Sequence, residues 1–297
     1  NWMWPRHTGD FSFYRAYVAK NGSPADFSED NIPYQPKSFL KVSAKGVSEG
    51  DFVMVTGYPG RTNRYRTANE VENQFEWAYP EGKQLRERLM EIIEETAIEG
   101  SDERIKYEGL LAGLANYAKN FTSMIEFYGK SPMLAERQDR EQQLTNWINQ
   151  NKQRKQRYGE TLSVLDGLIV QSQQHKERNL IVGYMRYTTM LPTARRLYRL
   201  ANENLLEDMV REPGYQERDM IRFKSGMERI DRRYAASVDR AMLFEMIQRY
   251  ANLPGEERIP AFDHAFNIGT TLDEVALNAV LDAMYANTQL NDLDARL

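Results

Sequence analysis

Apolar residues recur every three or four positions through most of the chain after Arg66, which is the spacing of amphipathic helices. The positions between them are polar, so each helix has one apolar face to bury against a neighbour. We therefore expect antiparallel helical hairpins packed as a bundle or a solenoid-like arc. The expected apolar faces are Leu85, Leu89, Ile92, Ile93 and Ala97; Leu110, Leu114, Tyr117, Phe121 and Ile125; Leu144, Trp147 and Ile148; and Leu162, Leu165, Leu168 and Ile169.

The same pattern continues, with interruptions, to the end of the chain. Pro192 marks a break between helices, because proline cannot continue a helix interior. Residues 220–250 form one long periodic segment. Residues 272–293 form the last expected helix, with Thr270 or Thr271 as its N-cap.

Methionine and tyrosine are concentrated in residues 184–190 and 242–250. We expect these side chains to fill the core of the helical part. A Met-rich surface that adapts to varied peptides is the alternative.

The first 65 residues follow a different pattern, with short aromatic and β-branched runs between turn signals. Residues 11–18, 39–42 and 51–58 are each expected to form a strand, and residues 21–24 a turn. Such runs favour an antiparallel sheet. Three strands cannot close a barrel, so we expect the rest of this sheet to lie elsewhere.

Composition excludes several classes of function. The 297 residues are 41% hydrophobic and 28% charged, and the net charge of −4 gives no electrostatic case for binding nucleic acid. No apolar run approaches the roughly 18 residues that cross a bilayer. The chain has no cysteine, which excludes disulfides, thiolate metal sites and a cysteine nucleophile.

The chain begins at Asn1 without an initiator methionine or a charged-then-apolar leader. Together with the incomplete set of strands, this favours an internal piece of a larger soluble protein.

Residues 1–10 contain the densest group of side chains that could act in binding or catalysis, Asn-Trp-Met-Trp-Pro-Arg-His-Thr-Gly-Asp. Pro5 and Gly9 indicate a shaped loop, and such loops often carry binding or catalytic groups. The alternative is a Trp-rich packing corner in which Arg6 and Asp10 are merely paired.

The three histidines give little evidence for catalysis or metal binding. His7 precedes Asp10 by three positions on a loop, which is a weak signal for a general base. His175 lies among charged residues and is expected to be solvated, and His264 has no second histidine at metal-ligand spacing. We therefore expect no metal site.

Two basic clusters lie on expected helices. Lys152, Arg154, Lys155 and Arg157 form one, and Arg195, Arg196 and Arg199 form the other. Both have acidic neighbours in sequence, so solvated faces with i,i+4 ion pairs are favoured over a nucleic-acid site.

The first thirteen residues, ending Thr-Gly-Asp-Phe-Ser-Phe, resemble the signature segment of the bacterial dipeptidyl-peptidase 7 and 11 family, of dipeptidyl aminopeptidase BII type. Residues 57–65, Gly-Tyr-Pro-Gly-Arg-Thr-Asn-Arg-Tyr, resemble the place where that family leaves its catalytic barrel. The resemblance implies a periplasmic or cell-surface homodimeric serine exopeptidase without a cofactor. It implies that residues 1–65 are part of a chymotrypsin-like double β-barrel, and that residues 66–297 are a large all-helical cap domain that is incomplete at its C-terminal end.

The resemblance also implies roles for individual residues. Asp10 matches the aspartate of a Ser-His-Asp triad, whose histidine would lie before Asn1 and whose serine would lie after Leu297. No Gly-x-Ser-x-Gly or Gly-Asp-Ser-Gly motif occurs in the chain, in agreement with a nucleophile elsewhere. Asn1, Trp2 and Asn116 match positions that receive the substrate's α-amino group, with an acidic partner expected further along. Arg6 would brace the loop or the region of Asp10.

Asn116 has some independent support from the pattern of its own helix. It lies off the apolar face, on a side where small residues would let another chain approach closely and where an amide oxygen could accept from an amine. An ordinary solvated asparagine is the alternative. The residues that share this side are Gly109, Ala112, Gly113 and Asn120.

The leading hypothesis is therefore a serine-type dipeptidyl-peptidase that releases dipeptides from the free N-terminus of oligopeptides. The rival is a non-catalytic helical module that binds peptides or proteins through a Trp-rich docking loop. The sequence does not decide between a hydrophobic and an acidic residue before the cleaved bond.

Overall fold

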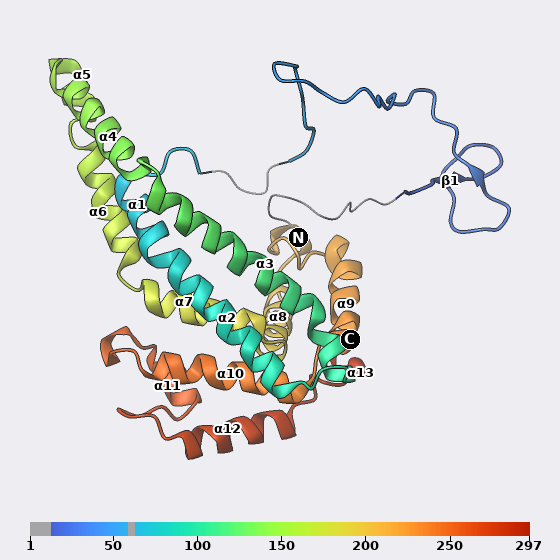
Figure 1. Ribbon diagram of the computed structural model, residues 1–297. Helices are drawn as coiled ribbons and strands as arrows, with labels where there is room; N and C mark the ends of the chain where they lie inside the picture. Colours follow the sequence, from blue (N-terminus) through green and yellow to red (C-terminus); the bar gives the residue numbers. More distant parts are fainter. Residues whose placement is uncertain (1–12, 59–62) are drawn as a thin grey trace. The chain divides into compact units, whose positions relative to one another are not determined.

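The computed structural model describes residues 13–58 and 63–297 (Figure 1). The chain divides into two units, residues 1–63 and residues 64–297. Each unit is described by itself.

The first unit contains one short antiparallel strand pair among its described residues. Strand β1 (Tyr17–Val18) pairs with β2 (Ile32–Pro33), with Tyr17 opposite Pro33 and Val18 opposite Ile32. The predicted turn is present: the backbone N–H of Gly22 donates to the carbonyl of Ala19 at 2.7 Å. Gly22 has a φ of +82°, a conformation that glycine adopts without steric cost.

Most of the predicted strands are absent from the described residues. The segments 39–42 and 51–58 are irregular, and of the described part of 11–18 only Tyr17–Val18 is a strand. Their apolar side chains are exposed, including Phe39 at 78% and Val42 at 97%. The physical reason is that a strand needs a neighbouring ladder and a face to bury, and the described residues supply neither.

The second unit is built from helices, as the period of the apolar residues predicts. The α-helices are α1 (Ala68–Glu72), α2 (Tyr79–Thr96), α3 (Asp102–Lys130), α4 (Met133–Asn149), α5 (Lys152–Tyr158), α6 (Thr161–Gln173), α7 (Lys176–Tyr184), α8 (Met190–Glu203), α9 (Met220–Glu228), α10 (Ala236–Ala251), α11 (Pro260–Ala265), α12 (Glu274–Asn287) and α13 (Leu293–Arg296). A π-helix, η1 (Asn73–Ala78), joins α1 to α2, and five 3₁₀ segments complete the unit: η2 (Met185–Tyr187), η3 (Asp208–Val210), η4 (Glu217–Asp219), η5 (Arg229–Arg232) and η6 (Gly255–Glu257).

Helices α2 and α3 pack side by side as a long hairpin (Figure 1). The expected apolar face of α2 is confirmed, because Leu85, Leu89, Ile92, Ile93 and Ala97 are all buried. Ser101 caps α3 by accepting from the backbone N–H of Arg104 at 3.2 Å.

The buried face of α3 differs from the expected one. Tyr107, Leu111, Leu114 and Ala118 are buried, whereas Tyr117 is 54% exposed. Two adjacent leucines at 110 and 111 allow either register in the sequence pattern. Packing against α2 selects the face that contains Leu111.

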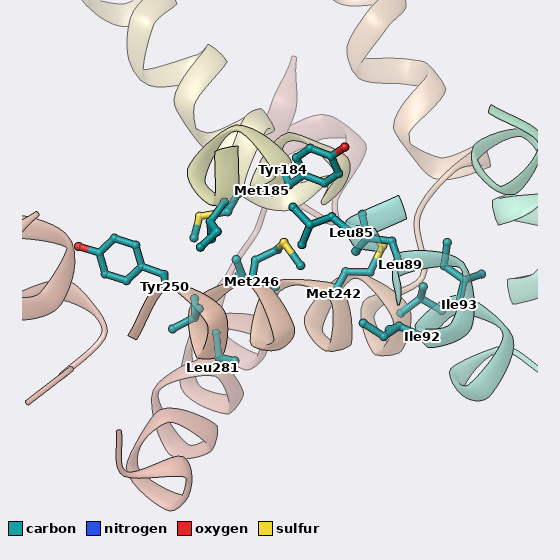
Figure 2. Packing of buried hydrophobic residues seen from close by; sticks show 14 of the residues in the cluster. Leu85, Leu89, Ile92, Ile93, Tyr184, Met185, Met242, Met246, Tyr250 and Leu281 are labelled. Carbon is teal, nitrogen blue, oxygen red and sulfur yellow. The ribbon is translucent and has the colours of Figure 1, made fainter. Parts of the chain in front are cut away.

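The core of the unit forms around α10, which contacts α2, α7 and α12. Met242, Met246 and Ile247 on α10 are fully buried, and Figure 2 shows the two methionines between residues of α2 and Met185. The expectation that the Met and Tyr residues of 242–250 pack in the core is confirmed. Unbranched methionine fills the uneven space between helices that cross at different angles.

Two predictions about the C-terminal part were wrong in detail. The segment 220–250 is not continuous, because η5 and an extended Ala235 separate α9 from α10. The last long helix is capped by Asp273 rather than by Thr270 or Thr271, and it ends at Asn287. The Asp273 carboxylate accepts from the backbone N–H groups of Val275 and Ala276, and its negative charge suits a helix N-terminus.

In the ranges 13–58 and 63–297, no helix combines the length and the apolar character needed to cross a bilayer.

Candidate functional site

The sequence-predicted residues of the N-terminal loop, Asn1, Trp2, Arg6 and Asp10, lie outside the described residues, as does His7. Asn116 is the one predicted site residue that the structure describes. It lies in the middle of α3, and its side chain is exposed.

Asn116 points away from the core, on the side of α3 opposite the buried Leu111 and Ala118. Gly109, Ala112, Gly113 and Asn120 share its side and are all exposed. A Cβ added at Gly109 or Gly113 would meet nothing within 4 Å. Gly109, Ala112 and Gly113, here called the small-residue face, therefore offer open backbone next to Asn116.

A buried arginine holds the other side of α3 in place. The Arg86 guanidinium of α2 donates to the carbonyl of Gly82 at 2.7 Å and to the hydroxyl of Tyr184 on α7. Its carbon Cζ lies 4.6 Å from the ring centre of Phe121 and 5.2 Å from that of Tyr117. Three helices thus share one cation, and Tyr117, the neighbour of Asn116 in sequence, is one of its contacts.

Burial lowers the pKa of Arg86, and the positive charge of Arg186 lowers it further. The Tyr187 hydroxyl, 3.4 Å from the guanidinium, acts in the opposite direction. No carboxylate pairs with Arg86 among the described residues, so carbonyl, hydroxyl and aromatic groups hold the charge instead.

Asp239 organises the N-terminus of α8. This fully buried carboxylate accepts from the backbone N–H groups of Thr189 and Met190 and from the hydroxyl of Tyr285 at 2.7 Å. Burial raises the pKa of Asp239, and these hydrogen bonds act against that rise. The carboxylate fixes the start of α8 and with it the direction of the basic side chains that α8 carries.

A cleft of about 800 Å³ opens beside the N-terminal half of α3. Its walls come from α3, η2, α8, α9 and η5, and Gly109 of the small-residue face is among its lining residues. No Asp or Glu lines it within the described part of the chain. Six cationic residues do, and they define what we call the basic cleft: Lys106, Arg186, Arg196, Arg229, Arg232 and Arg233.

None of these six cations forms an ion pair within the described ranges. The Lys106 ammonium donates to the carbonyl of Tyr234 at 3.1 Å, and the Arg196 guanidinium lies 4.7 Å from the ring centre of Phe223. A second hollow of about 680 Å³ shares Arg186 and Arg196 and adds Arg195. The positive surface therefore extends beyond the cleft.

The expectation of i,i+4 ion pairs for the two sequence clusters was wrong. In the described structure Arg199 pairs with Glu212, thirteen positions away, while Arg195 and Arg196 form no ion pair. In the other cluster, Arg154 lies 4.2 Å from the ring centre of Trp147 instead of beside a carboxylate. Helix α5 contains no acidic residue, and Glu203, four positions after Arg199 on α8, accepts from the backbone N–H of Glu212 instead.

The basic cleft was not predicted from the sequence. Its cations come from four separate segments of the chain, and only Arg196 belongs to one of the two basic clusters that are visible in the sequence. The adjacent pair Arg232–Arg233 was a local signal. Proximity of that pair to Lys106 and Arg186 required the fold.

His175 is paired as well as exposed to solvent. Its Nδ1 lies 2.7 Å from a carboxylate oxygen of Glu257, and its side chain is 41% exposed. No group of three His, Cys, Asp or Glu side chains suited to a metal ion occurs in the described residues.

Similarity to known proteins extends over the whole chain. The family model described as Peptidase S46 matches residues 1–297. The chain is 38% identical to the Asp/Glu-specific dipeptidyl-peptidase of Shewanella putrefaciens (strain CN-32 / ATCC BAA-453) over 100% of its own length and 40% of that protein. It is 34% identical to dipeptidyl-peptidase 7 of Capnocytophaga gingivalis, over 80% of this chain and 32% of that one.

A solved structure resembles the chain as well. The crystal structure of Porphyromonas endodontalis DPP11 in complex with the dipeptide Arg-Asp is 25% identical, with a TM-score of 0.57 over 100% of this chain and 44% of that chain. The chain thus spans less than half the length of the relatives that it matches. The match of the family model to all 297 residues shows that the chain belongs to the peptidase S46 family.

Proposed function

We propose that this chain serves in a serine-type dipeptidyl-peptidase that removes dipeptides from the free N-terminus of oligopeptides. The observation that carries the proposal is the family match over residues 1–297. The names of the relatives and the dipeptide bound to the solved neighbour point to the same activity.

In this proposal Asp10 is the triad aspartate. It accepts from the histidine Nδ1–H, holds that imidazole in the reactive tautomer, and stabilises the imidazolium that forms as the serine attacks. The histidine and the serine belong to segments of the whole protein outside these 297 residues. Arg6 braces the loop that carries Asp10.

The substrate's ammonium group binds to Asn1, Trp2 and Asn116. Asn116 supplies an amide oxygen that accepts from the ammonium, and its exposed position on α3 leaves that oxygen accessible. An acidic residue elsewhere in the whole protein completes the amine site. Fixing the amine two residues before the scissile bond sets the register of cleavage and makes the enzyme an exopeptidase.

The first unit would contribute to a chymotrypsin-like double β-barrel, and the helical unit would cap the cleft beside it. Residues 39–42 and 51–58, irregular here, would gain partner strands from the rest of the barrel. The whole enzyme would be a homodimer located in the periplasm or at the cell surface, acting without a cofactor.

The amine site is tested in the full-length enzyme with Asn116→Ala. We expect KM for peptides with a free N-terminus to rise about tenfold, since a hydrogen bond to a charged group contributes about 1.5–3 kcal/mol. Asn120→Ala is the matched control, because Asn120 is an exposed asparagine four positions along the same face of α3. Equal KM values for the two variants would remove Asn116 from the amine site.

The catalytic role is tested with Asp10→Asn and a fluorophosphonate probe. Loss of the triad aspartate is expected to lower kcat by roughly 10⁴. The wild-type enzyme should be labelled on a serine. Wild-type turnover by the variant, or no labelling of the wild type, would overturn the triad and leave a non-catalytic binding module.

A further inference from the structure

The six cations of the basic cleft lie close to one another without ion-pair partners in the described residues. Like charges that share a cleft repel, and low-dielectric walls concentrate their field. A bound anion relieves this repulsion, so the cleft has the electrostatics of an anion-binding site. Five of the six are arginines, whose planar guanidinium groups bind carboxylates through paired hydrogen bonds.

The cleft and Asn116 lie along the same side of α3. Gly109 lines the cleft, and Asn116 follows it by seven positions on the same helix. A helix rises about 1.5 Å per residue, so the two points are about 10 Å apart. Ala112 and Gly113 lie between them and present open backbone.

This spacing matches the length of a short extended peptide. A peptide with its amine at Asn116 advances about 3.3 Å per residue, so its third and fourth residues come within side-chain reach of the cleft. Those are the first two residues of the portion that remains after a dipeptide is released.

We propose, on the basis of the proposed function, that the basic cleft binds acidic side chains at the third and fourth residues of the peptide substrate. The cleft thereby selects peptides that are acidic beyond the cleaved bond. This selection is separate from any preference at the residue before that bond. Arg232 and Arg233 are the best probes of the site, because both are exposed and neither has an ion pair in the described structure.

The test uses the full-length enzyme and two tetrapeptides that share their first two residues and end in Glu-Glu or Gln-Gln. For the wild type we expect kcat/KM to be about tenfold higher for the Glu-Glu peptide, and this ratio to fall as salt is added. Arg232→Gln combined with Arg233→Gln should bring the ratio close to one. A dipeptide joined to an uncharged fluorophore has no third residue, so its hydrolysis should be unchanged and shows that the variant is folded.

Lys152→Gln combined with Lys155→Gln is the matched control. It removes the same charge from exposed positions on α5, outside the cleft. The proposed role of the cleft would be contradicted if the wild type gave equal kcat/KM values for the two tetrapeptides. It would also be contradicted if the arginine variant kept the wild-type ratio, whether or not the ratio fell in the lysine variant. If neither tetrapeptide loses a dipeptide, the proposed function itself fails, and this inference falls with it.

Discussion

Asp239 shows at the scale of one residue how burial makes stability depend on pH. Its pKa is raised above the ordinary 3.8, because burial outweighs the hydrogen bonds from Thr189, Met190 and Tyr285. A raised folded-state pKa favours the protonated form, so this contribution to stability is present below the ordinary pKa and is lost as pH rises through the folded-state pKa.

The variant Asp239→Asn cannot titrate at this position. We therefore expect the melting temperature of the wild type to rise relative to that of the variant as pH falls from 7 toward 4. Asp282→Asn is the control, because the Asp282 side chain is 68% exposed in its pair with Arg240 and should give a small offset. A wild-type-to-variant difference that stays constant over this pH range would contradict a raised pKa at Asp239.

Helix α3 illustrates how far one element can be predicted from sequence. Its helical period was predicted, and the exposed side with Asn116 and Gly113 was placed correctly. Its buried face was misplaced by about one position, because Leu110 and Leu111 both fit an apolar face. Tyr117 is 54% exposed although its ring contacts Arg86 of α2, and no pattern within α3 contains that information.

Glycine substitutions test whether the small-residue face of α3 is open. Gly113→Ala should stabilise the helix by about 1 kcal/mol, because the added Cβ has free space and alanine favours helix formation. If a peptide lies against this backbone, the same change should lower kcat/KM for tetrapeptides while the melting temperature rises. Gly82→Ala is the control: its Cβ would lie 2.9 Å from a ring carbon of Phe121, so it should destabilise. A lower melting temperature for Gly113→Ala would show that this face is packed.

At the scale of the whole molecule, the sequence predicted that the second unit is helical, but it did not predict the basic cleft. The amphipathic period is a local property, so the buried apolar residues from Leu85 to Ala97 could be predicted directly from the sequence. The basic cleft depends on contacts between residues far apart in sequence, such as the hydrogen bond from Lys106 to the carbonyl of Tyr234, 128 positions away. Hairpin packing brings these residues together, and a single sequence carries no record of it.

The absence of the predicted strands has a similar cause, because a strand needs partner segments that are distant in sequence as well as a suitable local composition. Residues 39–42 and 51–58 have the composition of strands, yet their apolar side chains are exposed and no ladder pairs them. Backbone amides without a hydrogen-bonded partner exchange with solvent readily. We therefore expect fast hydrogen–deuterium exchange at both segments in the 297-residue chain alone.

In the full-length enzyme, exchange at residues 39–42 and 51–58 should slow by orders of magnitude as the proposed barrel supplies partner strands. The β1 residue Val18 provides the internal comparison, since it is already paired in this chain. Equally fast exchange at residues 51–58 in both proteins would show that these residues form no strand in the full-length enzyme. It would contradict the assignment of the first unit to the barrel.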